Sequence, residues 1–183
     1  TEDLSEENIK KLIQFSPTKT LPLMQAGEFN ISGITPLTKF ILSSNKDIYK
    51  TLLGENNLIT SSIEMWIDFV EFKIKPLEGF IIKEGKVNTK DENGKIALID
   101  MENILNELNE HLKYRSFMVL HSITLADLYL ALNLAPYFYF VFNKTKLMNF
   151  PHIYRLFNYV CRLKMFGNLI EKELALNIQF EDM

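Results

Sequence analysis

The sequence predicts an α+β protein that is mostly helical, with a small mixed part followed by an all-helical part. Two short strand-like runs, 21–25 and 28–31, are joined by Ala26 and Gly27 at hairpin spacing. Beyond residue 57 the apolar residues recur at helical spacing. A helix over 125–135 is apolar on nearly every side, and such a helix belongs in the centre of a bundle.

The start of that central helix carries a complete set of initiation signals. Thr124 is placed to accept from the first-turn amides, and Asp127 is placed to reach back to the amide of Thr124. Ile123 and Leu128 stand where a hydrophobic staple fixes the entry angle of the chain. We therefore interpret Asp127 as a helix cap and not as a catalytic acid. The helix is too short to span a bilayer and is broken by Pro136.

Length, charge and cysteine content exclude several classes of protein. The 183 residues can bury a sizeable core as one domain or two small subdomains. The single cysteine, Cys161, excludes an internal disulfide, and without a signal-like start or a membrane-length apolar run we expect a cytoplasmic location. The formal net charge is -3 and the lysines are scattered, so direct binding to nucleic acid is not expected.

The mixed part is predicted to begin with an amphipathic helix over 4–15. Ser5 caps this helix, acidic residues open it, and Ser16-Pro17 ends it. The strand pair follows, with Pro22 at its head. A proline at this position indicates an edge strand, a bend or a cis peptide.

A second helix is expected over 34–42. Thr35 is its expected cap and Pro36 its first helical residue. A helical turn over 48–53 precedes a linker of glycine and asparagine at 54–57. We place the boundary between the two parts of the chain in this linker.

The all-helical part is predicted to start with a long helix over 63–74, which ends or kinks at Lys75-Pro76. Phe69 and Phe72 lie on a flank of this helix that is available to a neighbour or a partner chain. The core-facing stripe consists of Ile63, Trp66, Ile67, Val70 and Ile74.

The remaining segments alternate between loops and helices. Residues 83–95 are polar, carry both charges and contain two glycines, so we expect a mobile surface loop. An aromatic run follows Pro136, and Phe150-Pro151 opens a further helix. A last helix is expected over 166–176.

Between the polar loop and the aromatic run, a helix over 96–112 is predicted. This helix is expected to bury Ile99, Ile104, Leu105, Leu108 and Leu112.

No catalytic residue and no metal site is predicted. Cys161 lies within a helix and is interpreted as a small buried apolar residue, not a reactive thiol. The triplet Asn-Gly-Lys at 93–95 lacks the other features of a phosphate loop. The aromatic run over 137–142 has no basic neighbours, which favours a core or an interface over base stacking. The histidines are isolated from one another and from carboxylates at ligand spacing: His111, His121 and His152.

Several motifs occur together in this chain. A short strand pair headed by Pro22 precedes a helix, and the helical part contains Ser-Ile-Thr-Leu-Ala-Asp at 122–127 and Phe-Pro-His-Ile-Tyr-Arg-Leu-Phe at 150–157. In this combination they resemble the glutathione transferase fold. This resemblance implies a partial thioredoxin-like subdomain over 1–45, followed by an all-helical subdomain over 57–183.

Further motifs follow one order along nearly the whole chain, at 8–17, 21–23, 64–69, 112–117, 123–127, 150–151, 155–157 and 179–180. In this order the sequence resembles, within that superfamily, the amino-terminal domains of elongation factor 1 gamma subunits. The resemblance implies a non-catalytic assembly domain that anchors the guanine-nucleotide-exchange subunit of elongation factor 1. The fold also allows a homodimer through the helix that carries Trp66 and Phe69.

The same resemblance implies a degenerate ligand pocket. The first strand, first helix and second strand of the fold would precede Ser5, and the residue that activates glutathione normally lies there. The family's acidic–serine pair falls on Gly33-Ile34 or on Ile31-Ser32, and neither supplies a carboxylate for the ligand's ammonium group. We predict at most a vestigial glutathione pocket, formed by Leu21, Pro22, Ser32 and Gly33. Glutathione is not expected to bind there as a cofactor.

Two alternative functions are open at this point. The first is an active glutathione transferase that conjugates glutathione to electrophiles with an activating residue outside this chain. The second is the appended assembly domain of an aminoacyl-tRNA synthetase complex, which uses the same fold. A tyrosine or serine at the end of an upstream strand would favour the enzyme, whereas a synthetase core downstream would favour the second alternative.

Overall fold

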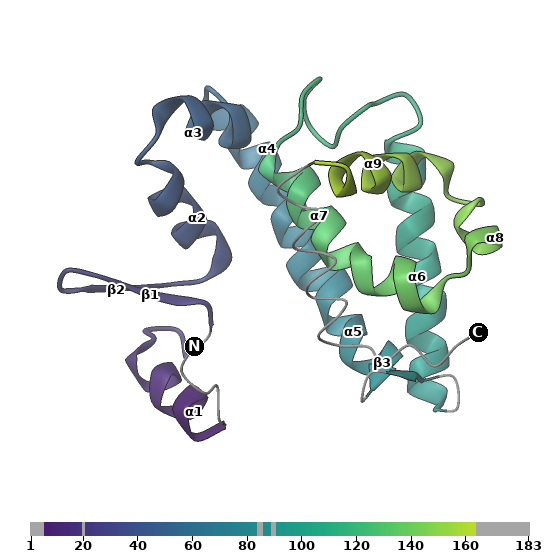
Figure 1. The fold of residues 1–183 in the computed structure, drawn as a ribbon, viewed down its shortest axis with the longest axis horizontal. Coiled ribbons are helices and arrows are strands. Elements are labelled where there is room, and N and C mark those ends of the chain that lie inside the picture. The colour runs from purple at the N-terminus through teal and green to yellow at the C-terminus, as the bar shows by residue number, and fades with distance from the viewer. Residues whose placement is uncertain (1–5, 20, 84–85, 89–90, 164–183) are drawn as a thin grey trace. The chain divides into compact units, whose positions relative to one another are not determined.

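A computed structural model describes residues 6–19, 21–83, 86–88 and 91–163 (Figure 1). The chain divides into two compact units, Thr1–Leu53 and Gly54–Met183. The predicted fold class is confirmed: a two-stranded sheet with helices in the first unit precedes a second unit that is almost entirely helical.

The first unit is built around an antiparallel hairpin. Strand β1 (Leu23–Ala26) pairs with β2 (Phe29–Ser32), with Leu23 opposite Ser32 and Ala26 opposite Phe29. Gly27 has a φ of 62° in the connecting turn, a conformation that glycine adopts at no steric cost. Helix α1 (Glu6–Phe15) precedes the hairpin, and helices α2 (Ile34–Leu42) and α3 (Lys46–Leu53) follow it.

The start of α2 differs from the prediction. The helix begins at Ile34 with Gly33 at the cap position, and no side chain caps it. Thr35 is therefore inside the helix and does not cap it. Gly33 has a φ of 96°, which few other residues adopt, so the backbone conformation sets this boundary. The expected cap of α1, Ser5, lies outside the described residues.

The second unit begins with α4 (Asn57–Phe69), whose first turn is capped by Asn56 through a 3.0 Å bond from the amide of Ile59. The helix is continued by a π-helical turn, η1 (Val70–Ile74), and then by α5 (Lys75–Ile81). Pro76 stands in the first turn of α5, where its missing N–H costs nothing. The break predicted at Lys75-Pro76 is thus a π-turn followed by a new helix.

The segment predicted as a loop over 83–95 contains regular structure. Strands β3 (Ile82–Lys83) and β4 (Lys86–Val87) form a short hairpin, and α6 (Glu92–His111) begins with Asp91 as its cap. The prediction also placed Ile99 in the core, whereas its side chain is 60% exposed. The buried face of α6 carries Gly94, Ala97, Met101, Ile104, Leu105, Leu108 and Asn109.

Helix α7 (Leu125–Pro136) forms the centre of the second unit, as predicted. It contacts α4, η1, the second π-helical turn η2 (Tyr137–Val141) and α9 (Pro151–Cys161). Figure 1 shows α7 in green beside α4. A short helix, α8 (Lys144–Leu147), connects η2 to α9. The helix predicted over 166–176 lies outside the described residues.

Candidate functional site

The residues of the predicted pocket meet at the open end of the hairpin. The Leu21–Pro22 peptide bond is cis, which is one of the three conformations that the sequence allowed. The amide of Gly33 donates to the carbonyl oxygen of Pro22 at 3.1 Å, and Leu23 pairs with Ser32. The hydroxyl groups of Ser32 and Thr18 are 2.7 Å apart and share a hydrogen bond.

The polar groups at this end of the hairpin are bonded within the protein. The hydroxyl of Ser32 is paired with that of Thr18, and the amide of Gly33 with the carbonyl oxygen of Pro22. Residues 31–34 contain no carboxylate, and a free amino group would need one for a charge-assisted hydrogen bond. The four residues of the predicted pocket therefore supply no charged group to a ligand.

Asp127 accepts three hydrogen bonds at the head of α7. The amide and the hydroxyl of Thr124 donate to Oδ2 at 2.8 and 2.7 Å, which confirms the predicted cap. The amide of Met118 donates to Oδ1 at 2.8 Å, a contact that the sequence did not suggest. Burial raises the pKa of Asp127 above its ordinary value, and the hydrogen bonds from Met118 and Thr124 oppose that rise. Asp127 holds the loop before α7 as well as the helix itself.

A polar cluster that sequence analysis missed joins η1 to α7. The hydroxyl of Tyr129 donates to Oε1 of Glu71, and Nζ of Lys75 lies 2.9 Å from the same oxygen. Burial, followed by the nearby Glu71 carboxylate, raises the pKa of Tyr129 to about 12. The phenol therefore stays protonated at neutral pH and serves as a hydrogen-bond donor. No sequence signal marks this cluster because Glu71 and Tyr129 are 58 residues apart.

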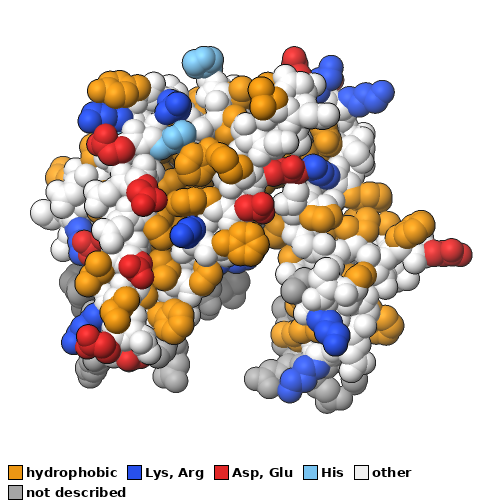
Figure 2. Space-filling view, turned by 180° about the vertical axis from the view of Figure 1, so that it is seen from behind, with side chains coloured by type: hydrophobic (Ala, Val, Ile, Leu, Met, Phe, Trp, Pro, Cys, Tyr) orange, Lys and Arg blue, Asp and Glu red, His pale blue; other side chains and the backbone are white. Residues whose placement is uncertain are grey.

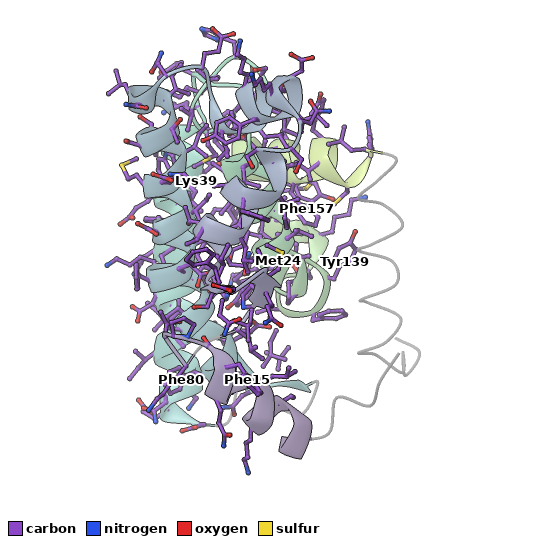
Figure 3. All side chains as sticks on the ribbon, turned by 90° about the vertical axis from the view of Figure 1, so that its left-hand side faces the viewer. Phe15, Met24, Lys39, Phe80, Tyr139 and Phe157 are labelled. Carbon is purple, nitrogen blue, oxygen red and sulfur yellow. The ribbon has the colours of Figure 1, made fainter. Side chains whose placement is uncertain are left out.

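The aromatic run after Pro136 forms part of the core of the second unit. Tyr137 and Phe138 are buried, and the ring of Phe138 meets that of Phe157 edge to face at 4.8 Å. Tyr139 also contacts Phe157, with ring centroids 5.8 Å apart (Figure 3). The prediction of a core or an interface is met for the buried rings, while Tyr139 stays 49% exposed.

The other candidate residues show no catalytic arrangement. Burial raises the pKa of the Cys161 thiol, which disfavours the reactive thiolate. The Nε2 atom of His111 hydrogen-bonds the carbonyl oxygen of Met118 at 2.8 Å, and its ring is tilted by 53° against the ring of Trp66. Among the described residues, no three His, Cys, Asp or Glu side chains are grouped as metal ligands require. No helix in the described part of the chain has the length and apolarity to cross a bilayer.

One face of α4 and η1 exposes apolar side chains in a continuous stripe. Leu58, Met65 and Phe72 are 80%, 55% and 76% exposed and recur every seven residues, with Ser62 and Phe69 between them. The ring of Phe69 meets Trp66 edge to face at 5.4 Å. Figure 2 shows hydrophobic side chains exposed among charged ones on the surface of the second unit. We call Leu58, Ser62, Met65, Phe69 and Phe72 the α4 stripe.

Residues 67–164, more than half of the chain, match the family model described as glutathione S-transferase, C-terminal domain. The chain is 28% identical over 149 residues to a probable elongation factor 1-gamma 2 of Arabidopsis thaliana, covering 80% of this chain and 36% of that protein. It is 24% identical over 147 residues to an elongation factor 1-gamma 1 of Oryza sativa, covering 79% and 35% respectively. The chain thus spans about a third of the length of these relatives.

Solved structures share the fold. The GST-like domain of elongation factor 1-gamma from Saccharomyces cerevisiae superposes with a TM-score of 0.71 at 18% identity, covering 86% of this chain and 75% of that one. Poplar glutathione transferase F1 superposes with a TM-score of 0.75 at 16% identity, covering 93% and 82%. At these identities the superpositions establish the fold alone, which the GST-like domain of an elongation factor shares with glutathione transferases.

Proposed function

Because the chain belongs to the glutathione S-transferase C-terminal domain family, we propose that it is the transferase-like assembly domain of an elongation factor 1 gamma subunit. The observation that carries this proposal is the similarity to plant elongation factor 1-gamma proteins along about four fifths of the chain. In this role the domain is cytoplasmic and non-catalytic, and it anchors the guanine-nucleotide-exchange subunit of the factor.

The chemistry of the described residues supports a binding role. The hydroxyl of Ser32 is hydrogen-bonded to that of Thr18, and the phenol of Tyr129 in the polar cluster is held protonated by burial and by Glu71. Asp127 is committed to three hydrogen bonds within the fold. What the domain offers is surface, including the exposed α4 stripe.

Binding to the exchange subunit tests the proposal directly. Isothermal titration calorimetry of the purified 183-residue chain with the exchange subunit is expected to show saturable heats of binding that fit a one-to-one complex. A poplar-type glutathione transferase of the same fold serves as the control and should give no heat of binding. Absence of a complex with the exchange subunit at micromolar concentration would overturn the proposed role.

The alternative, an active glutathione transferase, is favoured by one observation: the fold of poplar glutathione transferase F1 covers 93% of this chain. Glutathione at millimolar concentration is nevertheless expected to leave the melting temperature of the chain unchanged, because residues 31–34 offer no carboxylate for its ammonium group. A concentration-dependent rise in melting temperature would restore the enzyme hypothesis. Unrelated tripeptides at the same concentration are the control.

The same domain forms a homodimer through the α4 stripe. The Trp66 ring is anchored inward on His111, with ring centroids 4.6 Å apart, so the side chains available to a second copy are Leu58, Met65, Phe69 and Phe72. A stripe that repeats every seven residues can pack against its own copy across a two-fold axis, because each apolar side chain then fills a gap between two others.

Changing Phe72 to aspartate is expected to convert a dimer to a monomer, because it places a charge in a desolvated apolar contact. Sedimentation equilibrium over a concentration series measures the change. Ile99→Asp is the matched control, since Ile99 is a similarly exposed apolar residue on α6, outside the stripe. Equal dissociation constants for Phe72→Asp and wild type would place the contact elsewhere.

A further inference from the structure

Within residues 54–163 of the second unit, acidic and basic side chains are segregated along the chain. Residues 54–110 contain twelve acidic and six basic side chains, whereas residues 111–163 contain six basic side chains and one acidic side chain. That acid is Asp127, which has no exposed surface. Residues 111–163 therefore present only positive charge to solvent at neutral pH, although the chain as a whole is acidic.

Two arginines of this stretch, Arg115 and Arg155, lie where α9 packs beside the segment after α6. One terminal nitrogen of Arg155, Nη2, donates to the carbonyl oxygens of Arg115 and Leu112 at 2.6 and 3.3 Å. The guanidinium group of Arg115 donates in turn to the carbonyl oxygen of His111 at 3.2 Å. Arg162 is the cap residue at the end of α9, and because its backbone is still helical and it follows Arg155 by seven residues, it continues the face of α9 that carries Arg155.

Two tyrosines and a lysine complete this surface. Tyr159 lies on the same face of α9 between Arg155 and Arg162, and its ring meets Phe117 edge to face at 5.4 Å while staying 48% exposed. Tyr114 is 89% exposed, and Nζ of Lys113 lies 5.9 Å from the centre of its ring. We call this set the basic–tyrosine surface: Lys113, Tyr114, Arg115, Arg155, Tyr159 and Arg162.

The chemistry of this surface matches carboxylates borne on a polypeptide. A guanidinium group has five N–H donors in a planar fork that fits a carboxylate, and the two carbonyl contacts of Arg155 use only part of its set. Exposed tyrosine and arginine are the residues enriched at the centres of protein interfaces. Among the described residues, the one carboxylate paired with this surface is Glu110, 3.2 Å from Nζ of Lys113 and itself exposed.

We propose that the basic–tyrosine surface docks an acidic polypeptide segment, whose aspartate and glutamate side chains pair with the arginines while its backbone packs on the tyrosines. Nucleic acid is the less suitable occupant, since four cations make a small footprint and the neighbouring stretch 54–110 is acidic. The acidic side chains of the segment define the occupant, whichever protein carries it.

Fluorescence anisotropy with a labelled oligoglutamate peptide of about ten residues tests this inference. The double variant Lys113→Glu/Arg162→Glu is expected to weaken binding of the peptide by about tenfold or more, because two attractive charges become repulsive. The neutral variant Lys113→Gln/Arg162→Gln should weaken it by a smaller factor. Both positions are exposed, and thermal melts establish that each variant is folded.

The matched control is Lys73→Glu/Lys95→Glu, which makes the same change in net charge within the acidic stretch, at two exposed positions. It should leave peptide binding within about twofold of wild type. The proposal is overturned if both double variants weaken binding equally, if the wild-type chain does not bind the peptide at low salt, or if an oligouridylate of similar length binds as tightly. Because no exchange subunit is present, any of these results leaves the test of the proposed function unaffected.

Discussion

Replacement of Asp127 by alanine is expected to lower the free energy of unfolding by about 3 kcal/mol, because it leaves the buried amides of Met118 and Thr124 without their acceptor. The loss of a helix cap alone costs about 1 kcal/mol. The larger effect is expected because the carboxylate also holds the loop before α7, and α7 contacts α4 and α9. Urea denaturation followed by circular dichroism measures the difference.

Two controls separate the cap from the loop contact. Thr124→Val removes the hydroxyl that donates to Oδ2 but keeps both amide bonds, so it should cost less than Asp127→Ala. Asp100→Ala removes an exposed carboxylate from α6 and should leave the denaturation midpoint unchanged. If Asp127→Ala and the wild type have the same denaturation midpoint, the three hydrogen bonds make no net contribution to stability.

The raised pKa of Asp127 makes the free energy of unfolding depend on pH, and the direction of that dependence follows from the direction of the shift. A carboxyl whose pKa is higher in the folded state than in the unfolded state binds protons more tightly when folded. Its contribution to stability is therefore greatest below the ordinary value of 3.8 and falls as the pH rises through the raised folded value. The difference in unfolding free energy between wild type and Asp127→Asn, measured as a function of pH, reports this dependence.

Replacement of Asn109 by alanine is the second change with a large expected effect, about 2 kcal/mol of lost stability. Asn109 lies on the buried face of α6, and its Oδ1 accepts from the amides of His152 and Ile153 at 2.8 and 3.4 Å. These amides belong to the first turn of α9, where no intrahelical partner exists. Asn109, a residue of α6, thus caps the N-terminus of α9. Its loss should weaken the packing of α9 against α6.

Asn109→Asp discriminates the capping role from a simple packing role. The variant keeps an acceptor of the same size and adds a negative charge at a helix N-terminus, so it should retain more stability than Asn109→Ala above the pKa of the new carboxyl. Asn106→Ala, an exposed change on the same helix, is the control for helix propensity. Equal losses for the alanine and aspartate variants would contradict the capping role.

Local signals explain the successful predictions. Thr124 and Asp127 are three residues apart, and the capping box needs no information from the rest of the chain. The same holds for the apolar composition of α7, which places it in the centre of the unit. The prediction failed at residues 83–95, where a short hairpin and the first turn of α6 are made of polar residues that also suit a loop. It failed at Ile99 because an isoleucine on the outer face of α6 extends the apolar pattern without facing the core.

Local sequence patterns were enough to predict the long helices, the first hairpin and the cap of the central helix, and the ordered motifs carried the family resemblance. The tertiary structure alone decided which distant polar groups meet: Met118 with Asp127, Glu71 with Tyr129, and Asn109 with the first turn of α9. It also brought Arg155 of α9 against the backbone of Arg115. The physical reason is that caps and periodic stripes are formed by residues within one or two turns of each other, whereas these contacts join segments up to 58 residues apart and leave no periodic pattern in the chain.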